Sequence, residues 1–153
     1  MSIPFRRVVI IGVGLIGGSI AAALKQLDEA PQVCGIGPRE DTLKTALAAG
    51  ALDDYAVSDD PKADAWLMPW ASDLVIIATP VSAAREWFER LEARHFDGFI
   101  TDVASTKTVI TKIADEVLSD PTRFLPGHPM AGSEVNGFGG ARADLFQGAY
   151  WIL

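Results

Sequence analysis

The sequence contains a single cysteine, Cys34, and only two histidines, His95 and His128, in 153 residues. A disulfide framework needs at least two cysteines, and the common zinc sites need several Cys and His ligands. We therefore expect no metal, and we expect Cys34 to be a small core residue. Lysine and arginine are also few, at 13 against 20 Asp and Glu, which gives a net charge of −7. An acidic protein is poorly suited to a phosphate backbone, so we expect no nucleic-acid partner.

The sequence also lacks an uninterrupted apolar run long enough to span a membrane. Residues 8–24 contain one polar residue, Ser19, and follow Arg6 and Arg7, as in the start of a secretory signal. Four glycines interrupt this run, however, and no cleavage region follows it. A membrane span needs about 20 predominantly apolar residues. We interpret residues 8–24 as a buried strand and helix, and we expect a cytoplasmic protein without membrane attachment.

The sequence does contain a glycine turn between a strand-like and a helix-like segment. The apolar run 8–11 leads into Gly12-Val13-Gly14-Leu15-Ile16-Gly17, and apolar residues recur at helical spacing after it. Such a turn directs backbone N–H groups and the positive end of a helix dipole at one point, where a pyrophosphate fits. Gly12 permits the turn, Gly14 lets the phosphates approach, and Gly17 lets the helix pack on the strand. Dinucleotide binding is predicted, and a glycine-rich turn without a ligand is the alternative.

Strand-like and helix-like segments alternate along the rest of the chain. Strands are predicted at residues 32–36, 55–57, 74–78 and 99–101, and helices at 41–49, around 84–91 and around 109–117, the last with Val109, Ile113 and Val117 on its buried face. Residues 59–72 look least regular and are expected to form a surface excursion. The alternation predicts one α/β domain over residues 1–153, with a Rossmann-type, doubly wound and mostly parallel sheet. Ligands of such sheets bind beyond the carboxyl ends of the strands.

The residues after the second strand bear on the choice of cofactor. An NAD-binding domain usually has Asp or Glu about 20 residues after the glycine turn, where it binds the ribose 2′-hydroxyl. Here that position is Gly37, followed by Pro38 and Arg39. The missing carboxylate removes repulsion toward a 2′-phosphate, and a guanidinium can bind it, which favours NADP over NAD. Glu40 and Asp41 weaken this interpretation, and the alternative is a solvated Arg39 at the start of a helix.

Three further loops follow strands on the ligand side of the predicted sheet. The first contains Thr79 and Pro80, which we expect beside the cofactor. The second, residues 102–107, contains Ser105, and capping of the next helix would by itself explain this serine. The third, residues 126–134, is rich in turn formers and holds His128 between a glycine and a proline, which fix its backbone.

Together these segments resemble the nucleotide-binding domain of the prephenate/arogenate dehydrogenase family of tyrosine biosynthesis. The resemblance covers nearly the whole chain and rests on residues 9–19, 78–81, 101–107 and 127–134. It implies an NAD(P)-dependent oxidative decarboxylation of prephenate or arogenate. Hydride leaves the carbinol carbon for the nicotinamide, the hydroxyl proton is drawn off, and loss of CO₂ makes the ring aromatic.

The resemblance also implies roles for individual residues. The family's catalytic histidine corresponds to His128, as hydrogen-bond acceptor for the substrate hydroxyl. Histidine suits this role, because a side chain whose ordinary pKa is about 6.5 offers a neutral acceptor near pH 7. Ser105 corresponds to a serine that orients the imidazole and approaches the nicotinamide, and Ser133 and Glu134 fall where the family lines its substrate pocket.

Family members continue into a second, largely helical domain that dimerises and supplies an arginine for the substrate's carboxylates. No arginine of this sequence can be assigned that role, so we expect the nucleotide-binding and histidine-bearing portion of an enzyme that is a homodimer at full length. Two alternatives stay open. Another Rossmann dehydrogenase of the β-hydroxy acid type would leave residues 127–134 unexplained, and a non-catalytic NADP-binding or regulatory module would bind without turnover. The sequence does not separate prephenate from arogenate.

Overall fold

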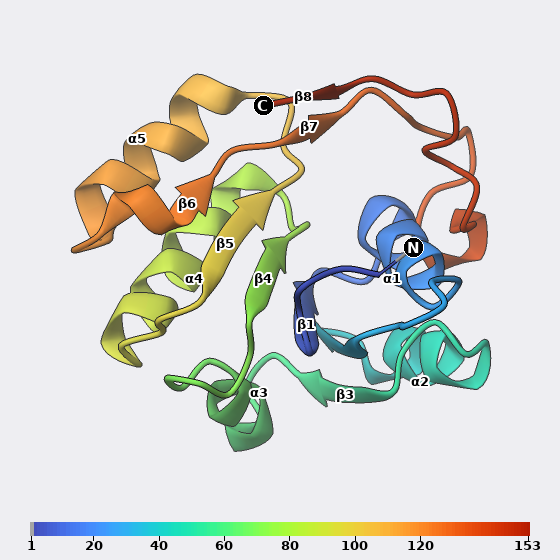
Figure 1. The fold of residues 1–153 in the computed structure, drawn as a ribbon, viewed down its shortest axis with the longest axis horizontal. Helices are drawn as coiled ribbons and strands as arrows, with labels where there is room; N and C mark the ends of the chain where they lie inside the picture. Colours follow the sequence, from blue (N-terminus) through green and yellow to red (C-terminus); the bar gives the residue numbers. More distant parts are fainter. Residues whose placement is uncertain (1) are drawn as a thin grey trace.

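A six-stranded parallel sheet forms the centre of the computed structural model, which describes residues 2–153 (Figure 1). The strands are β1 (Arg7–Ile11), β2 (Gln32–Gly37), β3 (Asp54–Val57), β4 (Leu74–Ile77), β5 (Phe99–Asp102) and β6 (Phe124–Leu125), in the order β3-β2-β1-β4-β5-β6. The chain moves outward from β1 to one edge and then from β4 to the other. The order of the strands and their parallel direction confirm the predicted Rossmann-type sheet. The ligand crevice of such a sheet lies where the strand order reverses, here between β1 and β4.

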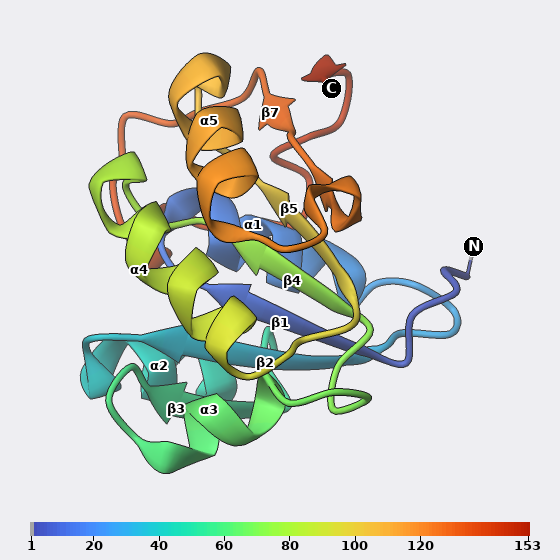
Figure 2. The ribbon, with the colours of Figure 1, turned by 90° about the vertical axis from the view of Figure 1, so that its left-hand side faces the viewer.

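Helices cover both faces of the sheet (Figures 1 and 2). One face carries α1 (Leu15–Leu24) and α2 (Glu40–Ala48), and the other carries α3 (Pro61–Trp66), α4 (Val81–Ala93) and α5 (Lys107–Val117). Because side chains of a strand alternate between faces, Val8 and Ile10 pack with α1 and α2, whereas Val9 and Ile11 pack with the other helices. Within residues 2–153, no helix is long and apolar enough to cross a membrane.

The stretch 59–72 is not the irregular surface excursion that the sequence suggests. It contains α3, which begins with Pro61 in its first turn, where a missing N–H has no intrahelical partner to lose. The Asp60 side chain caps this helix by accepting a hydrogen bond at 2.8 Å from a first-turn N–H. Trp66 and Leu67 are buried in the core. Pro61 therefore starts a helix that anchors the crossover to β4.

Helix α5 begins differently from the prediction, and its buried face is only partly the predicted one. Ile113 and Val117 are partly buried and pack against the core as predicted, but the fully buried residues are Ile110 and Ala114, and Val109 is 49% exposed. The N-cap position is held by Thr106, without a side-chain hydrogen bond, and not by Ser105. Capping therefore does not account for Ser105.

Beyond β6 the chain leaves the sheet and forms a short antiparallel ribbon near the carboxyl ends of β4 and β5 (Figure 1). In this ribbon β7 (His128–Pro129) pairs with β8 (Trp151–Ile152), and His128 stands opposite Ile152. The segment between them contains the short helix η2 (Phe138–Gly140), which packs against α1. A second short helix, η1 (Pro121–Arg123), precedes β6.

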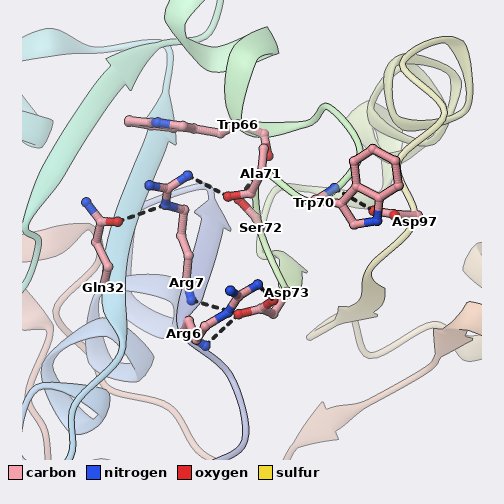
Figure 3. A network of polar contacts seen from close by, with 9 residues as sticks. All are labelled: Arg6, Arg7, Gln32, Trp66, Trp70, Ala71, Ser72, Asp73 and Asp97. Atoms are coloured by element: carbon pink, nitrogen blue, oxygen red, sulfur yellow. Dashed lines mark hydrogen bonds and ion pairs between the residues drawn. The ribbon is translucent and has the colours of Figure 1, made fainter.

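At the amino ends of the strands, on the side of the sheet away from the ribbon, Asp73 joins β1 and β4 (Figure 3). Its Oδ2 accepts hydrogen bonds from the backbone N–H of Arg6 at 2.5 Å and of Arg7 at 3.1 Å. The Arg7 guanidinium extends the network to Gln32 Oε1, at 2.8 Å, and to the Ala71 carbonyl. Partial burial opposes the charged form, but these hydrogen bonds and the Arg6 guanidinium outweigh it and hold the pKa of Asp73 below its ordinary value.

Candidate cofactor pocket and active site

A cavity of about 550 Å³ lies at the carboxyl ends of β1, β2 and β4. Its lining includes six of the predicted cofactor residues, which are Gly12, Gly14, Gly37, Arg39, Thr79 and Pro80. Gly137 and Phe138, from η2 and the residue before it, complete the wall. The cavity therefore occupies the point where the strand order reverses, which is where doubly wound sheets bind their ligands.

The glycines of the turn are required for different structural reasons. Gly12 has a φ of +95°, and a Cβ there would lie 2.7 Å from the carbonyl carbon and oxygen of Ala78. A Cβ at Gly17 would lie 2.0 Å from the Gly12 carbonyl oxygen, whereas a Cβ at Gly14 would meet nothing within 4 Å. Gly12 and Gly17 thus allow the turn to pack on its surroundings. Gly14 keeps space open in the cavity beside the start of α1.

The N-terminus of α1 is available to an anion. Leu15 and Ile16 form its first turn and do not line the cavity with their side chains. The N-cap is Gly14, so no side chain caps the helix, and the first turn has no acidic residue. The first backbone N–H groups of a helix have no intrahelical partner and, together with the helix dipole, favour a phosphate.

Two buried side-chain polar atoms lack a hydrogen-bond partner in the part of the chain that the structure describes. They are Thr79 Oγ1 and His128 Nδ1. A buried polar group left unpaired costs about 1–3 kcal/mol, so such groups point to partners outside the protein. Thr79 lines the cavity, and His128 begins β7 near the carboxyl end of β5. Both atoms are therefore suited to contact a molecule bound at the carboxyl ends of the strands.

Arg39 reaches the cavity from the loop after β2 and forms an ion pair with Asp41. Its Nη2 lies 2.8 Å from Asp41 Oδ2, and its Nε lies 3.3 Å from Asp41 Oδ1. This side-chain hydrogen bond raises the pKa of Arg39 and lowers the pKa of Asp41. Thr42 and Ser58 also line the cavity and add hydroxyl groups to its wall. A phosphate bound at Arg39 would share the guanidinium with the Asp41 carboxylate.

His128 follows Gly127, which an ion pair between Asp102 and Lys107 holds in place. Asp102, at the end of β5, is fully buried, and its Oδ1 accepts a hydrogen bond from Gly127 N at 3.0 Å. The Lys107 ammonium donates to both Asp102 oxygens, at 2.7 and 2.5 Å, and to the Gly127 carbonyl at 2.6 Å. Neither Asp102 nor Lys107 is predicted from the sequence to have a role at the site. The available signal was a carboxylate directly after an apolar strand, where a charge is expected only if it is paired.

The remaining predicted site residues, Ser105, Ser133 and Glu134, are exposed. Among residues 2–153 no hydrogen bond joins Ser105 to His128. Ser133 Oγ accepts a hydrogen bond from the Val135 N–H at 3.2 Å, within its own loop. All three lie in the loops that follow β5 and β7, but the structure does not bring them against the cavity.

Comparison with known proteins identifies the family. The family model of the prephenate dehydrogenase nucleotide-binding domain matches residues 20–153. The chain belongs to the prephenate dehydrogenase family. The match begins within α1, just after the glycine turn, so the turn and its cavity are an independent observation that agrees with a nucleotide-binding domain.

Individual members of this family are similar over nearly the whole chain. A prephenate dehydrogenase from Bacillus subtilis (strain 168) is 37% identical over 149 residues, which are 95% of this chain and 38% of the relative. An arogenate dehydrogenase from Synechocystis has a TM-score of 0.80 at 27% identity, over 95% of this chain and 48% of that one. A prephenate dehydrogenase from A. aeolicus, in complex with hydroxyphenyl propionate and NAD+, has a TM-score of 0.82 at 24% identity. The match covers 99% of this chain and 51% of that one. The chain thus spans about half or less of these relatives.

Proposed function

We propose that this domain binds NADP or NAD and contributes the catalytic histidine to the oxidative decarboxylation of prephenate or arogenate. A bound nicotinamide would accept the hydride of the carbinol carbon, and His128 would draw off the hydroxyl proton, while CO₂ would leave as the ring becomes aromatic. One observation carries the proposal. In this member of the family, the glycine-turn cavity and His128 both lie at the carboxyl ends of the parallel strands.

The cavity suits a dinucleotide at several points. Gly14 and the first N–H groups of α1, those of Leu15, Ile16 and Gly17, would hold the pyrophosphate. The orphaned Thr79 hydroxyl, beside Pro80, would supply a hydrogen bond to the cofactor. When bound, the nicotinamide supplies the hydride acceptor, and the protein contributes binding, orientation and the exclusion of water.

Of the two nicotinamide cofactors, we propose that the domain prefers NADP to NAD. Gly37 leaves no carboxylate at the end of β2 to repel a 2′-phosphate, and Arg39 lines the cavity close by. The Asp41 carboxylate competes for that guanidinium, which limits the size of the preference.

On the substrate side, His128 is proposed as the acceptor for the hydroxyl proton and Ser105 as the residue that orients its imidazole. Ser133 and Glu134 are proposed to face the substrate. We further propose a cytoplasmic enzyme, free of nucleic acid and membrane, that is a homodimer when the family's second domain is present. These assignments derive from the family, because the exposed serines and Glu134 make no contact with the cavity.

Titration calorimetry of this chain with NADP+ and NAD+ tests the first half of the proposal. The second half is tested by fusing the chain to the C-terminal part of the Bacillus subtilis relative and following NADPH absorbance with prephenate or arogenate. Nucleotide binding without turnover would favour the non-catalytic module, and oxidation of a β-hydroxy acid would favour the other dehydrogenase class. Failure of the chain to bind either nucleotide would overturn the proposal.

A further inference from the structure

The backbone of Gly127 is held by hydrogen bonds at both its N–H and its carbonyl, and its Cα is closely packed. Its N–H donates to Asp102 and its carbonyl accepts from Lys107, so both of its backbone polar groups bind members of one ion pair, of which Asp102 is fully buried. A Cβ at this position would lie 2.7 Å from Trp151 Nε1 and 3.1 Å from the Asp102 carbonyl oxygen, so only glycine fits. We refer to Asp102 and Lys107 as the Gly127 clamp. The clamp leaves the peptide just before His128 almost no freedom to rotate.

The hydrogen-bonding groups of the clamp are all used within the protein. An ammonium group has three N–H donors, and those of Lys107 face both Asp102 oxygens and the Gly127 carbonyl. The Asp102 carboxylate accepts, in addition, from the N–H groups of Ala104 at 2.8 Å and Gly127 at 3.0 Å. The donors of Lys107 and both oxygens of Asp102 are therefore engaged within the protein, with each other and with backbone groups.

On its other side His128 is constrained by Pro129. The proline ring fixes its own φ and restricts the preceding residue to an extended conformation. His128 also stands opposite Ile152 in the β7–β8 ribbon. The Gly127 clamp and Pro129 thus determine the backbone of His128 from both directions, whereas the half-buried imidazole has no partner at Nδ1.

We propose that Asp102 and Lys107 are positioning residues, which orient the His128 imidazole by holding the Gly127 peptide. That the oriented imidazole withdraws the substrate's hydroxyl proton rests on the proposed function. That Asp102 and Lys107 orient it does not. Burial of the Asp102 charge is a poor way to gain stability, because its desolvation opposes the attraction to Lys107. A pair that engages both backbone polar groups of one residue is better explained by control of geometry.

The experiment measures how fast diethyl pyrocarbonate modifies His128 in this chain, with exposed His95 as an internal reference read from the same mass spectra. Lys107→Met removes the donor to Gly127 and should raise the His128 rate several-fold while the His95 rate stays constant. Amide hydrogen exchange at His128 should accelerate in parallel. Lys107→Arg keeps donors for both acceptors and should return both rates toward those of the unmodified chain.

Lys112→Met is the matched control, because Lys112 lies on the same helix and its 3.9 Å ion pair with Glu116 is exposed. This variant should leave His128 unchanged. If Lys107→Met does not fold, Asp102→Asn combined with Lys107→Met removes the uncompensated buried charge and still deletes the contact to the Gly127 carbonyl. A folded Lys107 variant whose His128 reacts and exchanges at the original rates would overturn the proposal. Failure of the proposed function is seen separately, in nucleotide binding and turnover, which these rates do not involve.

Discussion

The Ser19 hydroxyl accepts a hydrogen bond from the Arg142 backbone N–H at 3.0 Å, across 123 residues of sequence. The preceding residue of α1, Gly18, packs against the same segment, since a Cβ there would lie 2.6 Å from Phe138 Cδ2 and 3.0 Å from Ala141 Cβ. Two adjacent small residues of α1 therefore anchor the segment that carries Phe138 into the wall of the nucleotide cavity. The cofactor site is built from both ends of the chain.

Ser19→Ala removes this anchor and leaves the Arg142 N–H without its partner. We expect the free energy of unfolding to fall by about 1 kcal/mol, the usual net value of one hydrogen bond. Urea titration measures the change, and Thr108→Ala, at an exposed position of α5, serves as the control. Equal stability of the Ser19 variant and the unmodified chain would mean that the contact contributes nothing.

Gly14→Val and Gly17→Val should separate binding from folding. A side chain at Gly14 meets open space, so this variant should unfold cooperatively near the original temperature but lose its nucleotide affinity. A side chain at Gly17 meets the Gly12 carbonyl and should destabilise the fold itself. Melting curves with and without NADP+ distinguish the two cases. Saturation at 100 times the dissociation constant stabilises a protein by about 2.7 kcal/mol. A ligand-induced rise in melting temperature that survives Gly14→Val would count against the pyrophosphate site.

Arg39→Ala and Asp41→Ala should shift cofactor preference in opposite directions. Without the guanidinium, NADP+ affinity should fall about tenfold relative to NAD+, as expected for a charge-assisted hydrogen bond in an exposed position. Without the Asp41 carboxylate, Arg39 is free for the 2′-phosphate and the ratio should rise. Calorimetric titration with both nucleotides measures the two ratios. NAD+ binding as tight as NADP+, or an Arg39→Ala ratio equal to the original, would show the assignment to be wrong.

His128→Asn should lower kcat by about 10²- to 10⁴-fold in the fused, active enzyme, which is the usual contribution of a positioned acid–base group. Ser105→Ala should lower kcat less, because it is assigned to orienting the imidazole. Nucleotide affinity should hardly change in either variant. Near-normal turnover of His128→Asn would make this residue an incidental loop histidine.

Asp73→Ala should reduce stability in a pH-dependent way. The pKa of Asp73 is lowered in the folded chain, so its contribution is complete above the ordinary carboxyl range and is lost as pH falls through the folded value. We expect a loss of about 1–3 kcal/mol near neutral pH, from hydrogen bonds to a charged acceptor. The difference between variant and unmodified chain, measured by urea unfolding, should shrink in acid. A difference that is constant with pH would assign the effect to packing alone.

The sequence predicts the central sheet well, because strands buried on both faces are continuously apolar and the glycine turn marks the first crossover. It predicts α3 poorly, since Asp60 and Pro61 are equally typical of a turn and of a helix start. The Gly127 clamp could not be predicted, because Asp102 and Gly127 are brought together only when β5 and the following loop are in place. The same holds for Phe138, whose place in the cavity wall depends on tertiary contacts with α1.

His128 pairs with Ile152 in a ribbon that is much shorter than the strands of the central sheet. The glycine turn belongs to a six-stranded sheet, which opens only when the domain unfolds, whereas β7 and β8 form a ribbon of two residues each, and both β8 residues are exposed. Short, exposed pairings open at far lower free energy than core strands. The β8 strand can therefore separate from β7 and pair again while the Gly127 clamp still holds the backbone just before His128.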